Sequence, residues 1–225
     1  MEQKRTLIDH LIEQNKHAQA LPLIQEELKQ VPNDQVLRFW LATCLYFTDE
    51  DQQAKSLLAE LLAESPENIE FLFLKFRIAL HHNELADAEE VVLNLIKLRP
   101  EEADYYSLYA LVMLNSFNLE KAKALIVEAS RLRPQLSPHI QLMQCMIQVI
   151  EGNAKDAETT IGALLLEEPE DLIYLQQLAQ VLLNRRKHRA ALVIYESLVR
   201  YSPQNSYYRN MVIELRIVCP LERHY

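Results

Sequence analysis

The sequence predicts an all-α protein built from helical repeats, on three observations. Only two glycines occur among 225 residues, whereas β-sandwiches and nucleotide-binding α/β folds use many glycines for tight turns and close backbone approaches. Six of the nine prolines recur at intervals of 34 or 35 residues, at Pro32, Pro66, Pro100, Pro134, Pro169 and Pro203. An alanine lies twelve residues before each of them, at Ala20, Ala54, Ala88, Ala122, Ala157 and Ala191. A fixed period of this length indicates a repeat array.

Each repeat is predicted to consist of two antiparallel helices, with the proline ending the second one. Proline lacks a backbone N–H and its ring clashes with the preceding turn, so a helix does not continue through it. Polar residues after the prolines are predicted to cap the next helix by accepting hydrogen bonds from its free backbone N–H groups. These caps are Asp34, Asn68, Ser137, Asp171, and Asn205 or Ser206. The periodic alanine is predicted to lie where two helices cross too closely for a larger side chain.

The proline period divides the chain into six repeats and a last helix. The expected repeats are residues 1–34, 35–68, 69–102, 103–136, 137–171 and 172–205, and the C-terminal helix is expected at 206–217. Repeat five carries one extra residue. Either its first helix begins one residue late, with Pro138 at the first helical position, or a bulge before Gly152 absorbs the extra residue. The sequence leaves both alternatives open.

The pattern resembles the tetratricopeptide repeat (TPR) family over about residues 1–205. The family's leucine early in the first helix is matched by Leu7, Leu41 and Leu178, and the small residue after it by Ala42, Ala110 and Ala179. Ile8 and Phe76 replace the small residue in two other repeats, which should loosen or tilt those hairpins. The resemblance implies a right-handed superhelix of about six hairpins, forming one TPR array over residues 1–225 with a C-terminal capping helix.

The resemblance also implies a concave groove, lined by the first helix of each repeat. Carried over residue by residue, it gives a set of candidate peptide-binding residues: Phe39, Thr43, Tyr46, Phe73, Arg77, Leu80, Ser107, Leu111, Gln176 and Gln180. Such a groove would take an extended or helical peptide with one or two apolar anchors, since exposed apolar patches mark interaction sites. The alternative is that tight superhelical curvature packs these side chains against one another.

Charge is distributed unevenly along the chain. Residues 1–171 hold 15 Lys and Arg against 29 Asp and Glu, a balance of −14, whereas residues 172–225 hold 8 against 3, a balance of +5. A basic end that meets an acidic face of another copy would steer self-association. The candidate residues for it are a basic turn and an apolar final helix: Arg185, Arg186, Lys187, Arg189, Met211 and Leu215.

The sequence contains no motif of a known catalytic, phosphate-binding or metal-binding class. It lacks H-E-x-x-H, G-x-S-x-G and Walker patterns, and Cys44, Cys145 and Cys219 form no C-x-x-C pair. The adjacent His81 and His82 do not face each other on a helix, so a metal site there would need further ligands. We therefore expect no enzymatic activity, no cofactor and no metal.

The expected partners and location follow from charge and hydropathy. The acidic balance argues against a nucleic-acid partner, because such partners favour a basic face. A polar N-terminal segment without the apolar core of a signal peptide, and the absence of any stretch of eighteen apolar residues, predict a cytoplasmic chain that does not span a membrane.

Three hypotheses for the function remain. The first is a non-enzymatic adaptor or scaffold that binds a protein or peptide partner in the concave groove. The second is a self-associating assembly protein, whose main partner is another copy of the chain. The third is the TPR arm of a longer membrane-anchored or multidomain protein.

Overall fold

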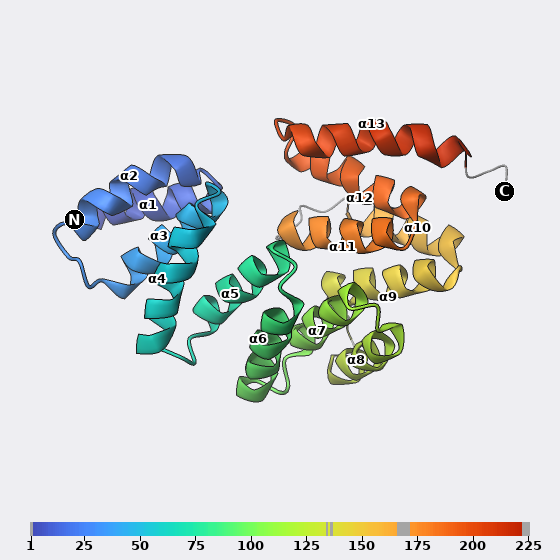
Figure 1. The fold of residues 1–225 in the computed structure, drawn as a ribbon, viewed down its shortest axis with the longest axis horizontal. Coiled ribbons are helices and arrows are strands. Elements are labelled where there is room, and N and C mark those ends of the chain that lie inside the picture. Colours follow the sequence, from blue (N-terminus) through green and yellow to red (C-terminus); the bar gives the residue numbers. More distant parts are fainter. Residues whose placement is uncertain (1, 134, 136, 166–171, 222–225) are drawn as a thin grey trace. The chain divides into compact units, whose positions relative to one another are not determined.

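The computed structural model describes residues 2–133, 135, 137–165 and 172–221, and within these residues it contains thirteen α-helices and no strand (Figure 1). This confirms the predicted all-α class. None of the described helices has the length and hydropathy that crossing a bilayer requires. Pro134, Pro169 and Asp171, which are part of the predicted repeat pattern, lie outside the described residues. The helices are α1 (Glu2–Glu13), α2 (His17–Leu28), α3 (Gln35–Phe47), α4 (Asp51–Glu64), α5 (Ile69–His81), α6 (Leu85–Leu98), α7 (Ala103–Asn115), α8 (Leu119–Leu132), α9 (Pro138–Glu151), α10 (Ala154–Leu164), α11 (Leu172–Asn184), α12 (His188–Tyr201) and α13 (Ser206–Leu221).

The chain divides into two compact units, unit 1 (residues 1–91) and unit 2 (residues 92–225), with the division inside α6. In unit 1, α1 packs on α2 and α3 on α4, while α2 also contacts α3 and α4 contacts α5. In unit 2, α7 packs on α8, α9 on α10 and α11 on α12, and α13 packs on α12. Each unit is therefore a succession of helix hairpins. A single array over the whole chain stays a prediction.

The periodic alanines are buried in the helical core. Ala20, Ala54, Ala88, Ala122 and Ala191 are fully buried and Ala157 is 1% exposed. In unit 1 the surrounding core includes Ile24, Leu37 and Cys44, with Trp40 packed against it. Because a well-packed core does not accept extra methylene groups without strain of about 1–3 kcal/mol, a residue larger than alanine is costly here. Ile8 and Phe76, the two departures from the family pattern, are also buried.

The predicted helix caps form wherever the structure describes them. The Asp34 carboxylate accepts a hydrogen bond from the Leu37 N–H at 2.9 Å, and the Asn68 side chain accepts from the N–H groups of Glu70 and Phe71. Further caps join Ser137 to the Ile140 N–H and Asn205 to the Tyr208 N–H. Each such bond satisfies one of the N–H groups that have no partner inside the helix and contributes about 1 kcal/mol.

A residue with left-handed backbone closes every hairpin, at nearly constant spacing. These residues are Asn15, Asp49, Asn83, Phe117, Gly152 and Arg186, with φ between 55° and 104°. The N–H of the next residue donates to the carbonyl four residues before the left-handed one, as in Glu50 N–H to Leu45 O at 2.9 Å. This six-residue ring is the Schellman closure of a helix end. Asn, Asp and Gly tolerate positive φ, whereas Phe117 and Arg186 adopt it at a cost.

The extra residue of repeat five lies in the connection before its first helix. α9 begins at Pro138, and Ser137 is its N-cap, so the late-start alternative describes this helix. Gly152 keeps the position of the left-handed residue, 35 residues after Phe117 and 34 before Arg186. The final helix α13 extends to Leu221, four residues beyond the expected end at 217, because the apolar stripe continues to the buried Cys219.

Replacing Arg186 with glycine tests whether the hairpin turns demand left-handed backbone. Arg186→Gly should raise the free energy of unfolding of unit 2 by about 1 kcal/mol, since it removes a Cβ from a residue with φ of 56°. Arg189→Gly, inside α12, should instead lower it by up to about 1 kcal/mol. Urea denaturation followed by circular dichroism measures both. A loss of stability in Arg186→Gly would contradict the assignment.

Candidate protein-binding surfaces

The first candidate surface lies on α3 and α5, which contact each other in unit 1. The ring centroids of Phe39 and Phe71 are 5.0 Å apart, so aromatic packing joins the two helices. Phe39 and Phe73 remain partly exposed and Val36 is 53% exposed. The Thr43 hydroxyl, one turn after Phe39, donates to the Phe39 carbonyl oxygen at 3.0 Å. The α3/α5 face, defined as Val36, Phe39, Thr43, Phe73 and Arg77, therefore presents accessible aromatic and aliphatic surface.

An aromatic cluster of His17, Tyr46 and Phe47 packs beside this face. The rings of His17 and Phe47 stack at 4.0 Å, and the ring of Tyr46 lies 5.2 Å from that of Phe47. The Arg77 guanidinium carbon is 5.3 Å from the centroid of the Phe47 ring. Tyr46 and Leu80 are buried, so these two predicted groove residues have no surface to offer a peptide. Packing within the chain replaces the expected contact.

In unit 2 the first helices contact one another, and two of the predicted groove residues are buried. α7 contacts both α9 and α11, and Ser107 and Leu111 of α7 are fully buried. The Ser107 hydroxyl donates to the Asp104 carbonyl oxygen at 2.7 Å. Their burial agrees with the alternative of mutually packed first helices and leaves these two side chains no exposed surface for a peptide.

The two predicted glutamines of α11 stay partly exposed but already have partners. Gln176 accepts a hydrogen bond from the Tyr208 hydroxyl at 3.0 Å, which ties α11 to α13. Gln180 donates to the Asn184 side chain at 3.1 Å. Their amides are thus held by bonds within unit 2.

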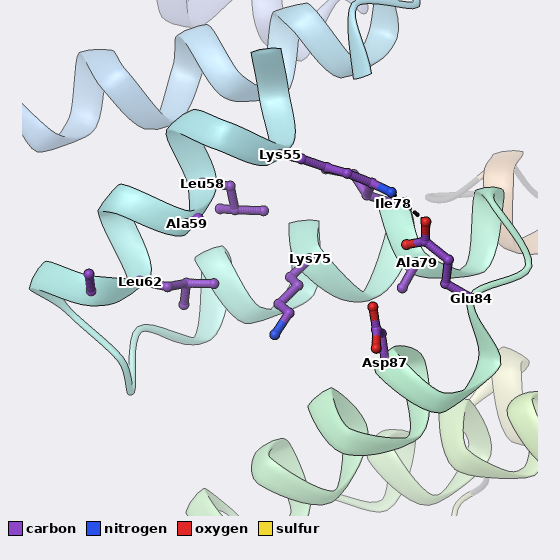
Figure 2. A pocket seen from close by; sticks show the side chains of 10 residues that line it. Lys55, Leu58, Ala59, Leu62, Lys75, Ile78, Ala79, Glu84 and Asp87 are labelled. Atoms are coloured by element: carbon purple, nitrogen blue, oxygen red, sulfur yellow. Dashed lines mark hydrogen bonds and ion pairs between the residues drawn. The ribbon is translucent and has the colours of Figure 1, made fainter. Parts of the chain in front are cut away.

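A pocket of about 470 Å³, which no sequence pattern predicts, opens between α4, α5 and the start of α6 (Figure 2). Leu58, Leu62 and Ile78 form its apolar lining. At one edge Lys55 and Glu84 form an ion pair of 2.6 Å, drawn as a dashed line in Figure 2. The residues that line the pocket come from three helices. Within its own helix, each apolar residue among them has the spacing of an ordinary core residue, so the sequence alone does not indicate the pocket.

A second exposed surface lies on α12 and α13 in unit 2. Ile213 and Ile217, one helical turn apart on α13, are 59% and 65% exposed. A shallow pocket of about 560 Å³ beside them has an apolar floor and a charged rim: Val193, Glu196, Val199, Arg200, Arg209, Val212, Ile213 and Arg216. The Arg216 guanidinium binds Glu196 at 2.7 Å. The α12/α13 surface, defined by these residues and Ile217, is thus apolar with a mainly basic edge.

The residues predicted for self-association lie only partly on exposed surface. Leu215 is buried and Met211 is partly buried, whereas Arg186 and Arg189 are exposed and Lys187 is partly exposed. Arg185 turns back onto its own unit, where it donates to the Leu114 carbonyl oxygen at 3.3 Å and lies 4.9 Å from the centroid of the Phe117 ring. The two α13 residues predicted from the sequence are thus less exposed than Ile213 and Ile217 on the same helix. The exposed pair Ile213 and Ile217 has i, i+4 spacing that would have identified it.

Reactive side chains are scarce among the described residues. Cys44, Cys145 and Cys219 are buried, and burial raises the pKa of the Cys44 thiol to about 12, so this thiol stays protonated at neutral pH. One group of three potential metal ligands does come together, formed by Asp51, His81 and His82. The sequence identified the histidine pair but missed Asp51, which precedes it by thirty residues.

The pH dependence of stability tests the packing of the aromatic cluster. Burial, together with the positive charge of Arg77, lowers the pKa of His17 from 6.5 to about 4. The folded state keeps this imidazole neutral while the unfolded chain takes up a proton below about pH 6.5, so stability falls as the pH drops from 6.5 towards 4.

Protonation of His17 in the unfolded chain should by itself lower the free energy of unfolding by about 2 kcal/mol when the pH falls from 7.5 to 5. His17→Phe keeps a ring against Phe47 but cannot be protonated, so its loss over the same interval should be smaller by that amount. Urea titrations of both proteins at the two pH values measure the difference. Identical pH dependence of the two proteins would show that His17 is not held neutral.

Comparison with known proteins agrees with the hairpin architecture. The family model of the tetratricopeptide repeat matches residues 11–64 and 52–112. No curated protein is significantly similar to the chain in sequence. Among solved structures, the chain is similar to PilF of Pseudomonas aeruginosa, with 16% identity, a TM-score of 0.60, and coverage of 95% of this chain and 96% of that one.

Two further structures show the same fold. A tetratricopeptide repeat protein from Parabacteroides merdae has 13% identity and a TM-score of 0.58, with coverage of 96% of this chain and 98% of that one. MamA of Desulfovibrio magneticus has 18% identity and a TM-score of 0.58, with coverage of 75% and 97%. The family model thus assigns residues 11–112 to the tetratricopeptide repeat family, and the solved structures show that the same fold extends over most of the chain.

Proposed function

We propose that the protein is a non-enzymatic adaptor or scaffold that binds a partner peptide on the α3/α5 face of unit 1. The tetratricopeptide repeat fold is a scaffold for protein–protein interaction, which supports a protein or peptide partner. The observation that carries the choice of surface is the partial exposure of Phe39 and Phe73 on two adjacent first helices. Aromatic side chains on a solvent-facing patch commonly anchor a partner.

The chemistry of the face defines the peptide that fits it. Phe39 and Phe73, with Val36 beside them, favour a segment with one or two apolar anchors. Arg77 contributes a guanidinium on the same helix as Phe73, which favours a carboxylate close to those anchors. Ser107 and Leu111, the corresponding residues in unit 2, are buried, so the proposal is restricted to unit 1.

Selection from a displayed library of random peptides, with the purified chain as bait, tests this function. Enriched peptides should share apolar anchors, and their dissociation constants are measured by fluorescence anisotropy. Phe39→Glu with Phe73→Glu should weaken binding by at least about tenfold, since each change places a charge in the apolar contact.

Val127→Glu is the matched control, because Val127 is an aliphatic residue of unit 2 that is 70% exposed. It should bind the selected peptides as the wild type does, and circular dichroism should show all variants to be equally helical. Failure to enrich any peptide would count against the proposal. So would equal affinity of the double variant and the wild type.

A second candidate function, self-association, is favoured by the α12/α13 surface. Ile213 and Ile217 expose aliphatic surface on α13, and residues 172–225 carry a positive balance while residues 1–171 carry a strongly negative one. We propose that a second copy covers this surface, with its acidic residues facing the arginines of the rim. Such charge pairing is screened by salt.

Light scattering after size-exclusion chromatography tests this second function over a series of salt concentrations. The wild-type chain should have the mass of a dimer or larger assembly at low salt and dissociate partly as salt is added. Ile213→Glu with Ile217→Glu should be monomeric throughout, whereas Val127→Glu should behave as the wild type. A wild-type monomer at every salt and protein concentration would refute self-association.

A further inference from the structure

Two hairpin turns of unit 1 bring three potential metal ligands together. Asp51 is the first residue of α4, His81 is the last residue of α5, and His82 is the C-cap of α5. The Asp51 Oδ2 atom lies 2.8 Å from Nε2 of His82 and 3.9 Å from Nδ1 of His81. One donor atom from each residue lies within 4.8 Å of the other two. The three side chains thus converge from two successive repeats.

From this geometry we infer that Asp51, His81 and His82 bind a divalent transition-metal ion, with Zn²⁺ as the reference ion. Zinc binds imidazole nitrogen and carboxylate oxygen at about 2.0–2.2 Å, so donor atoms around one ion lie roughly 3–4 Å apart. The distance from Asp51 to His82, 2.8 Å, is slightly shorter than this range, and the distance from Asp51 to His81, 3.9 Å, lies within it. Small side-chain rotations would therefore suffice to place the three donors around one ion. Two imidazoles with one carboxylate favour zinc, copper or nickel over magnesium or calcium.

The surroundings of Asp51 favour a cation over a simple ion pair. The side chain of Asp51 is only 16% exposed, and its Oδ1 atom is buried without a hydrogen-bond partner. Such a buried, unsatisfied carboxylate oxygen is costly, and a divalent ion bound to the same carboxylate would offset that cost. Asp49 and Glu50 precede Asp51 in the chain, and their charges add to the negative potential that attracts a cation.

An ordinary ion pair explains only part of the arrangement. It accounts for the contact of Asp51 with His82, but Nδ1 of His81 is too far from the carboxylate for a hydrogen bond at 3.9 Å. The ring of His81 instead lies edge-on to Tyr46, with centroids 5.7 Å apart. This contact helps to hold the second imidazole beside the other two donors. Both histidine side chains remain about one third exposed, which gives an ion and its water ligands access.

Bound metal would join the start of α4 to the end of α5. Because the folded unit offers all three donors together and the unfolded chain does not, metal binding would stabilise the fold by mass action. At a free concentration one hundred times the dissociation constant, the midpoint of thermal unfolding should rise by about 5–10 °C. Because His81 contacts Tyr46, the region that bound metal would stabilise lies beside the aromatic cluster.

Isothermal titration calorimetry of the tag-free chain with ZnCl₂ at pH 7.4 tests the site. One ion per chain should bind with a dissociation constant in the micromolar range. Two variants should each weaken zinc binding by at least about tenfold. One is the single variant Asp51→Asn, and the other is the double variant that combines His81→Ala with His82→Ala. His10→Ala is the matched control, because His10 is exposed on α1 and contacts Glu13 and Gln14 of the same chain segment, and it should leave zinc binding unchanged.

Two further measurements test the site even if one of the variants does not fold. Co²⁺ added to the wild-type chain should give visible absorption bands typical of nitrogen and oxygen ligation, and zinc should displace them. Zinc should also raise the unfolding midpoint of the wild type and of His10→Ala but not that of Asp51→Asn. Binding only at millimolar zinc, or equal binding by Asp51→Asn and the wild type, would overturn the proposal.

Discussion

The close crossing of two helices at a buried alanine is the constraint on which each hairpin depends. Ala20, Ala54 and Ala88 are fully buried, so the helix backbones approach to a distance that a larger side chain would prevent. This approach allows a short turn to connect the helices and lets the next first helix pack into the same core. The scarcity of glycine has the same origin, because alanine provides the close contacts without the entropic cost of glycine in a helix.

Local features were predictable from the sequence because they depend on residues that are neighbours in the chain. Asp34 and Asn68 cap the helices that follow them, and the alanine period located buried positions of the core. Phe117 and Arg186 could not be identified as left-handed, since neither side chain favours that backbone. It goes with the backbone hydrogen bonds that close the two turns, from the N–H of Asn118 to the Met113 carbonyl and from the N–H of Lys187 to the Leu182 carbonyl. The start of α9 needed the structure, because the extra residue fits the sequence pattern equally well before Ser137 or before Gly152.

The candidate sites were harder to predict because they depend on contacts between elements that are not neighbours in sequence. Ser107 and Leu111 occupy the same repeat positions as Phe73 and Arg77 but are buried, because α7 contacts two later first helices. A single repeat pattern does not contain this difference in packing. Asp51 illustrates the same limit, since its proximity to His82 arises only when one hairpin turn stacks on the turn of the next repeat.

The recurrence of one backbone state at every hairpin turn has a consequence for how such a chain changes its length. The segment from Asp49 to His82 begins at one left-handed residue and ends just before the next, Asn83. Removing or duplicating such a segment in the gene joins two chain ends with the same dihedral angles and the same closing hydrogen bond. Every hairpin turn is therefore a natural breakpoint for recombination, at which the number of hairpins could change while each junction stays unstrained.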